Sequence, residues 1–474
     1  MKIKTAKKVL VAAVASLVAG GAFAVVNLDA PGTPPTYASE LDYSAGIANT
    51  GNLDLTTKLG FGVSAGQNRY IRLELTNAKF AAPFDTTLVS VAPNTFDNVV
   101  VSQGGAVGQN YVILQVTSNT PNGTAETDVV SLGLPAAGIT IDSTASNVTV
   151  SYQLHETAVS AVAGASGAAL LYKNSGVAIV KFAKALSATF TKNTSYADVA
   201  ATPAFSQFET GTGAINATTT SLGTVSFAIA DVLNAAGGNV ALIDLVSAGA
   251  GDNLLTIAGT NADFSSAASM ALDPAGTCAG GGVGGSIAGD FKSATFDVFG
   301  VMPANNAASP ATATVCYVAN TTDPIAIQQT TAAINYTEAG TATAVADVSA
   351  TAFGEILHNG TELQGPWFTT NANYVSRFVL TSQYTQDADY KATLITEDGN
   401  TCTTPGSAAT GTLKAGKQLI VSAADICAGF SANTRAAVVF TVSAPNNTIQ
   451  GVYNVVNPTT GSISVSSLLR RGTN

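Results

Sequence analysis

The chain has 474 residues, of which 46% are hydrophobic and only 11% are charged, against about 25% charged residues in typical soluble domains. A disordered chain shows the opposite balance, so this composition predicts a folded protein with a sizeable core. The 20 basic residues are outnumbered by 30 acidic ones, which excludes the large positive surface that nucleic-acid binding requires. We therefore expect a folded, acidic protein that does not bind nucleic acid.

Residues 1–24 have the three parts of a secretory signal peptide. The positive part consists of Lys2, Lys4, Lys7 and Lys8. An apolar run over 9–18 follows, and Ala22-Phe23-Ala24 forms a small-x-small cleavage site. That run is too short to span a bilayer, which takes about 20 residues, and no later run reaches this length. The sequence predicts export without a membrane span, and a mature chain from Val25 with 16 basic and 30 acidic residues, a net charge of −14.

Alternation of apolar and polar residues recurs along the chain, which is typical of half-buried β-strands. In the run 70–76, Ile71, Leu73 and Leu75 would face the core while the polar positions between them face outward. A second run, 390–396, leads into a turn containing Asp398-Gly399, which predicts a hairpin. We therefore expect an all-β protein made of several β-sandwich domains in tandem, of the immunoglobulin-like or jelly-roll-like kind.

A mature chain of this length exceeds one sandwich, and about 150 residues per domain predicts three. We place the first domain at 46–205, the second at 206–350 and the third at 351–474. The boundaries fall in Ala/Thr-rich stretches near 205 and 350.

The segment 25–45 precedes the first domain as a short apolar strand followed by a Pro-rich arm. Such an arm is extended, and two packing arrangements are open to it. It can pack on its own domain, or it can add to the sheet edge of a neighbouring copy.

The four cysteines cluster in two pairs along the chain, and four cysteines can pair in three ways. Their spacing favours the disulfides Cys278–Cys316 and Cys402–Cys427, which suits an exported protein. Zinc is the competing hypothesis, but no CxxC pair is present and neither histidine lies near a cysteine in sequence. We therefore predict two disulfides and no free thiol.

Catalytic signals are few. The chain has two histidines, His155 and His358, which leaves few ways to assemble a Ser-His-Asp or metal-His₃ site. We interpret both as structural. The run 280–285 fits the GxGxxG pattern of phosphate-binding loops, but it lacks the strand before and the helix after that the pattern requires. We predict a flexible loop there and a protein that is not an enzyme.

Acidic residues flank the predicted hairpin of the third domain. These are Asp387, Asp389, Glu397 and Asp398. Carboxylates are the ligands that Ca²⁺ takes, so these four are weak calcium candidates, with a solvated strand edge as the alternative. No other cofactor is expected. The lone tryptophan, Trp367, either fills the core or, if exposed, stacks on a sugar.

The last hundred residues carry the runs 374–381, 397–400, 411–417, 422–426 and 461–469. Together they resemble a module found in bacterial exported proteins. The whole chain is similar in style to bacterial surface-layer and surface-filament subunits, being acidic, β-rich and rich in Thr, Ala, Gly and Asn. No cell-wall-binding repeat is present, and the resemblance implies no particular functional residue.

These observations favour a secreted structural protein of the cell surface, whose partner is itself in a homo-oligomeric surface layer (S-layer) or filament. The N-terminal strand is one candidate contact. The alternatives are a secreted adhesin or carbohydrate-binding protein, and then a secreted hydrolase. Low charge suits self-assembly, because unpaired charges are costly to bury at a packed interface.

Overall fold

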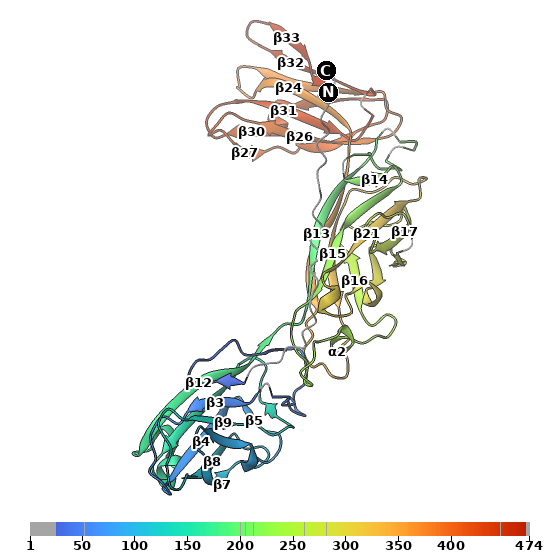
Figure 1. Cartoon of the computed structure of the whole chain (residues 1–474). Helices are drawn as coiled ribbons and strands as arrows, with labels where there is room; N and C mark the ends of the chain where they lie inside the picture. The colour runs from blue at the N-terminus through green and yellow to red at the C-terminus, as the bar shows by residue number, and fades with distance from the viewer. Residues whose placement is uncertain are drawn as a thin grey trace, which may run out of the picture.

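The computed structural model describes residues 25–470 except 52, 200, 204, 212, 260, 281 and 446. The predicted signal peptide, 1–24, lies outside the described residues. Strands make up 51% of the chain and helices 6%, which confirms the all-β prediction. Figure 1 shows three β domains arranged end to end along a bent rod. No helix among the described residues is long and apolar enough to cross a membrane.

The first domain packs a six-stranded sheet, in the order β2-β12-β11-β4-β8-β7, with a four-stranded sheet β1-β3-β9-β6 and the pair β10-β5. Its elements are β1 (Val26–Asn27), β2 (Thr36–Ala38), β3 (Leu55–Lys58), β4 (Asn68–Thr76), β5 (Ala78–Phe80), β6 (Val89–Ala92), β7 (Phe96–Gly104), β8 (Tyr111–Ser118), β9 (Val129–Leu132), β10 (Ile139–Ile141), β11 (Val148–His155), α1 (Ala158–Ala163) and β12 (Leu170–Ala183).

The alternating apolar residues of β4 face the core, as predicted. Ile71, Leu73 and Leu75 are fully buried. Arg72, predicted to face solvent, is only 9% exposed, because it lies over the Tyr111 ring at 4.4 Å.

The middle domain is a single sheet whose strands run in the order β18-β17-β21-β15-β13-β23-β22-β16-β20-β19, with β14 paired to β15. Its two end strands are consecutive in sequence, so the sheet curls into a near-barrel rather than the predicted sandwich. Its elements are β13 (Leu186–Ala197), β14 (Ala214–Asn216), β15 (Thr219–Ile229), α2 (Leu242–Leu245), β16 (Leu254–Ala258), β17 (Ala267–Asp273), β18 (Val283–Gly284), β19 (Ser286–Ile287), β20 (Ser293–Asp297), β21 (Ala311–Ala319), β22 (Gln328–Asn335) and β23 (Val348–His358).

Strand pairing moves both domain boundaries. β13 pairs with β15 and β23 of the middle sheet, so the first boundary lies at 184–185 and not at 205. β23 runs on to His358 within the same sheet, so the second boundary lies at 359–360 and not at 350. Composition pointed to Ala/Thr-rich stretches, but hydrogen bonding between strands decides where a domain ends.

The third domain is a sandwich of the sheets β28-β26-β31-β24-β34 and β29-β25-β32-β33, with the ribbon β27-β30 at its side. Its elements are β24 (Thr361–Thr369), β25 (Val375–Ser382), β26 (Ala388–Ile395), β27 (Cys402–Pro405), β28 (Thr410–Leu413), β29 (Gln418–Ser422), α3 (Ala423–Ile426), β30 (Cys427–Phe430), β31 (Arg435–Val442), β32 (Ile449–Val456), β33 (Ile463–Ser467) and β34 (Leu469–Arg470).

The turn at Asp398-Gly399 does not close the hairpin that the sequence predicted. Gly399 has the positive φ of 72° that such a turn uses, but β26 pairs with β28 and β31. The strand after the turn, β27, pairs instead with β30. The Cys402–Cys427 disulfide joins these two strands. The turn therefore directs the chain toward β30 and not back along β26.

The N-terminal segment packs on its own chain. β1 pairs in parallel with β3, β2 pairs in parallel with β12, and Leu28 is buried. In the structure the arm 25–45 thus packs on its own chain, and its addition to a neighbouring copy stays a prediction.

The segment 36–48 also binds the middle domain, with backbone hydrogen bonds from Ala38 to Leu233 and from Ala48 to Ala235. The first and middle domains share one continuous hydrophobic core. The third domain has a core of its own, reached through the two-residue connection 359–360. The rod thus consists of a fused two-domain body and a separately folded end.

Candidate functional site

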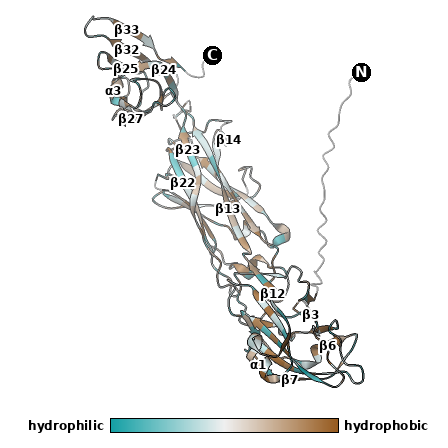
Figure 2. Cartoon of the chain, turned by 90° about the vertical axis from the view of Figure 1, so that its left-hand side faces the viewer, coloured by the Kyte–Doolittle hydropathy of each residue, from teal (hydrophilic) through white to brown (hydrophobic). Residues whose placement is uncertain are grey.

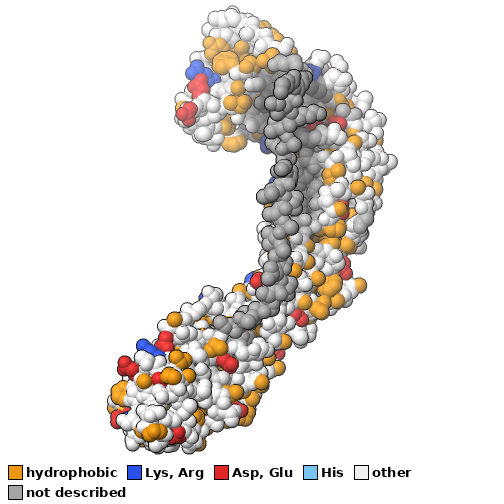
Figure 3. Space-filling model, viewed as in Figure 1, with side chains coloured by type: hydrophobic (Ala, Val, Ile, Leu, Met, Phe, Trp, Pro, Cys, Tyr) orange, Lys and Arg blue, Asp and Glu red, His pale blue; other side chains and the backbone are white. Residues whose placement is uncertain are grey.

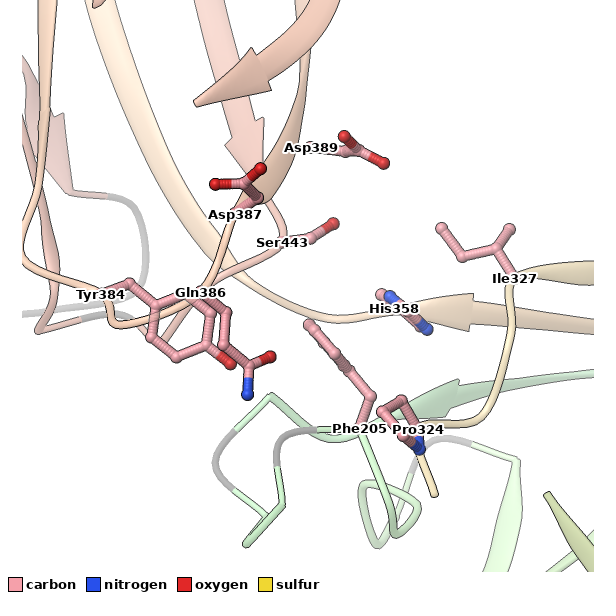
Figure 4. A pocket seen from close by; sticks show the side chains of 9 residues that line it. All are labelled: Phe205, Pro324, Ile327, His358, Tyr384, Gln386, Asp387, Asp389 and Ser443. Carbon is pink, nitrogen blue, oxygen red and sulfur yellow. The ribbon is translucent and has the colours of Figure 1, made fainter. Parts of the chain in front are cut away.

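A cleft separates the middle domain from the third domain, and Figure 4 shows the side chains that line it. From the middle domain, His358 stacks on Phe205 with ring centroids 3.8 Å apart. Its Nε2 lies 2.6 Å from the backbone oxygen of Ile325. Burial lowers the pKa of His358, although the Ile325 oxygen and Asp389 act in the opposite direction. The imidazole is therefore a packed, neutral part of the domain junction.

The third domain contributes Asp387 and Asp389 to the same cleft. Asp387 forms an ion pair of 2.7 Å with Lys414, and the hydrogen bond from Lys414 holds its pKa below the usual value. Asp389 accepts a hydrogen bond of 2.8 Å from the Thr412 hydroxyl. Both carboxylates therefore already have partners of their own.

The four weak calcium candidates do not come together. Asp387 and Asp389 lie at the start of β26, whereas Glu397 and Asp398 follow its far end, about 25 Å away for a strand of eight residues. Glu397 pairs with Arg435 at 2.8 Å. Within the described residues, no group of three or more His, Cys, Asp or Glu side chains is placed to hold a metal ion. One calcium site made from all four is excluded by this distance.

His155 belongs to a buried hydrogen-bond network that superficially resembles a catalytic dyad. Its Nδ1 lies 2.9 Å from Ser160 Oγ and its Nε2 lies 3.1 Å from Gln153 Oε1. Ser160 Oγ also accepts from the backbone N–H of Ala169. His155 is fully buried, and burial lowers its pKa, with the Arg72 charge adding to the effect. A nucleophile without access to substrate cannot react, so this network is structural.

Trp367 is exposed over 49% of its surface at a bulge in β24. It packs edge-on against Tyr453 and lines a shallow surface hollow with Pro366 and Ile395. The Glu397–Arg435 ion pair borders the same hollow. The indole therefore presents a large apolar face to solvent beside paired polar groups.

Two edge strands expose apolar side chains at the ends of the rod. Every residue of β33 is exposed, including Ile463 at 67% and Val465 at 62%. At the other end, β7 exposes Val100 and Val101 by about 40% each. Free strand edges of this kind are templates for pairing with another chain.

The disulfides are the pairs Cys278–Cys316 and Cys402–Cys427, and no cysteine is free. The first joins the Gly-rich loop at 278–285 to β21. The short strand β18 lies within this run at Val283–Gly284, and β19 follows it at Ser286–Ile287, so the helix that a phosphate-binding loop requires does not come next.

Sequence reasoning missed Glu40, a buried carboxylate at the junction of the first and middle domains. It is 3% exposed and accepts hydrogen bonds from the backbone N–H groups of Ala185, at 2.7 Å, and Leu186, at 3.1 Å. No local pattern marks it, because its partners lie about 145 residues away.

Comparison with known proteins gives only remote likenesses. No family model matches the sequence, and no curated protein matches it. The BSP domain of a biofilm-associated protein is similar over 95% of this chain and 83% of its own, with 11% identity and a TM-score of 0.20. The full-length major pilin RrgB from Streptococcus pneumoniae is similar over 93% of this chain and 67% of its own, with 8% identity and a TM-score of 0.16. These are weak structural resemblances to bacterial surface proteins, and we base no functional conclusion on them.

Proposed function

We propose that the protein is exported and serves as a non-enzymatic structural subunit that assembles with itself into a surface layer or extracellular filament. The observation that carries this proposal is the rod itself. Two domains share one core, a third extends the line (Figure 1), and an exposed edge strand lies at each end. Such a rod spans distance and presents contacts at both ends.

Surface composition supports the same proposal. On the face shown in Figure 3, charged side chains are scattered and most of the visible surface is uncharged. Packed contacts bury such a surface at little electrostatic cost. Two disulfides are typical of proteins that function outside the reducing cytosol. Both histidines are held in structural contacts, which supports a non-enzymatic role.

Negative-stain electron microscopy of the purified mature chain, residues 25–474, tests this proposal. We expect ordered sheets or fibres, and matching structures on the surface of cells that produce the protein. The control is the same preparation in denaturant, which should show none. A protein that stays monomeric in sedimentation at every concentration tried would contradict the proposal.

A second candidate function is glycan binding, and the exposed Trp367 favours it. If the hollow around this residue binds sugar, oligosaccharides should change its fluorescence, because it is the only tryptophan. Aromatic stacking contributes about 0.5–1.5 kcal/mol beyond area burial, so Trp367→Ala should weaken binding by about two- to twelvefold, measured by calorimetry. Tyr374→Ala is the matched control, since Tyr374 is a similarly exposed aromatic residue of the same domain. Equal binding by both variants would reject this function.

A further inference from the structure

The hairpin β32–β33 carries an unprotected edge. β33 pairs only with β32, and it is the one edge strand in the described sheets whose residues are all exposed. Natural edges are usually blunted by lysine, proline or a bulge. β33 contains neither residue, and its pairing with β32 has no register shift. Ile463 and Val465 alternate along it and face the same side of the sheet.

The strand β7 presents a second open edge at the opposite end of the molecule. Figures 1 and 2 both place β33 at one end of the rod and β7 at the other. β7 pairs only with β8 and, at nine residues, is the longest edge strand among the described sheets. Its pairing shifts register at 96–98 and again at 101–103, and the stretch 98–101 between these shifts pairs regularly. Its central residues Val99, Val100 and Val101 match the apolar character of β33.

Charge is distributed unevenly along the rod. Residues 25–360 carry 24 acidic and 9 basic residues, a net charge of −15, whereas residues 361–474 carry six acidic and seven basic residues, a net charge of +1. Contacts between two copies of the acidic body are therefore repulsive. A contact between the third domain of one copy and the body of another avoids that repulsion. The exposed Arg377 adds positive charge to the sheet that ends in β33, in register with Asn454 and Val465.

We propose that β33 of one copy adds to the β7 edge of a second copy, joining copies head to tail. This inference rests on the proposed function and names its interface. Backbone hydrogen bonds between the two free edges give the contact its affinity, and the facing valine and isoleucine side chains are removed from water. Because the two edges lie at opposite ends, the contact is heterologous and does not close on itself, so it generates an open chain of subunits.

Single lysine substitutions on either edge test the interface. Val465→Lys places a charge on β33 and Val100→Lys places one on β7, at positions exposed by 62% and 42%, so folding should be retained and can be checked by circular dichroism. Each should raise the concentration needed for assembly, measured by sedimentation velocity, about tenfold or more, because a charge at a pairing edge must be desolvated. Ile243→Lys is the matched control, since Ile243 is 65% exposed on α2 of the middle domain, and it should assemble normally.

Mixing the two edge variants distinguishes head-to-tail pairing from other contacts. Val465→Lys retains an intact β7 and Val100→Lys an intact β33, so an equimolar mixture should form dimers with one junction, while each alone stays monomeric. If both variants assemble as readily as the unmodified chain, this interface is overturned while the proposed function stands. If Val465→Lys abolishes assembly and Val100→Lys does not, the pairing of β33 with β7 is overturned. An unmodified chain that never assembles would overturn both proposals.

Discussion

Replacing Cys402 and Cys427 by alanine should lower the unfolding free energy of the third domain by about 3.5 kcal/mol and leave the first two domains unchanged. The disulfide spans 25 residues, and closing a loop of that size reduces the entropy of the unfolded chain by this amount. The effect stays local because the third domain has its own core, whereas the first and middle domains share another.

The position of the single tryptophan makes this measurable without labels. Trp367 lies in β24 of the third domain, so its fluorescence follows the unfolding of that domain alone. Far-ultraviolet circular dichroism follows strands throughout the chain. In a guanidinium titration, the fluorescence midpoint should fall in the variant while the circular dichroism transition of the fused body keeps its midpoint.

The other disulfide provides the matched control. Cys278–Cys316 spans 38 residues within the middle domain, so its removal should cost the fused body about 4 kcal/mol and leave the fluorescence transition in place. If all probes report one coincident transition that both variants shift equally, the three domains unfold as one unit and the division into two cores is wrong.

Glu40→Ala should destabilise the junction of the first and middle domains by about 2–6 kcal/mol. Two buried backbone N–H groups, of Ala185 and Leu186, lose their acceptor, and an unsatisfied buried donor costs about 1–3 kcal/mol each. The shared transition of the two domains should separate into two steps in circular dichroism. Small-angle X-ray scattering should show a broader distribution of shapes.

Two further variants keep this prediction specific. Glu40→Gln retains one oxygen at the same position and should recover most of the stability. Asp42→Ala removes a carboxylate from the same segment whose hydrogen bonds go only to nearby Ser44, and it should have no effect on the junction. Destabilisation by Glu40→Gln as large as that by Glu40→Ala would show that the negative charge of the carboxylate, and not a single acceptor oxygen at that position, holds the junction.

Local patterns predicted the strands well, because alternation is a property of neighbouring residues. β4 buries Ile71, Leu73 and Leu75 as its sequence requires. The same pattern failed for Arg72, since whether an outward position meets solvent depends on what covers that face of the sheet. The Asp398-Gly399 turn formed, but its strand found a partner elsewhere, because turn chemistry sets a bend and not the next pairing.

Two of the candidate sites changed meaning in the structure, one through exposure and the other through distance. Trp367 proved half-exposed, and the four acidic candidates proved to lie at opposite ends of β26. Sequence places Asp389 and Glu397 only eight positions apart, but an extended strand turns that separation into distance. The two edge strands gave no sequence signal at all, since an edge is defined by the absence of a neighbouring strand.

The sequence by itself determined that this is an acidic, sparsely charged chain that forms β-strands. Composition is read directly from the residues, and alternation places neighbouring apolar side chains on the one face of a strand that is buried from water. Only the tertiary structure decided which strands pair, where the domains end, that two domains share a core and which edges remain open. Those outcomes depend on contacts between residues distant in sequence, such as Glu40 with Ala185, and loop closure over such distances leaves no trace in a local pattern.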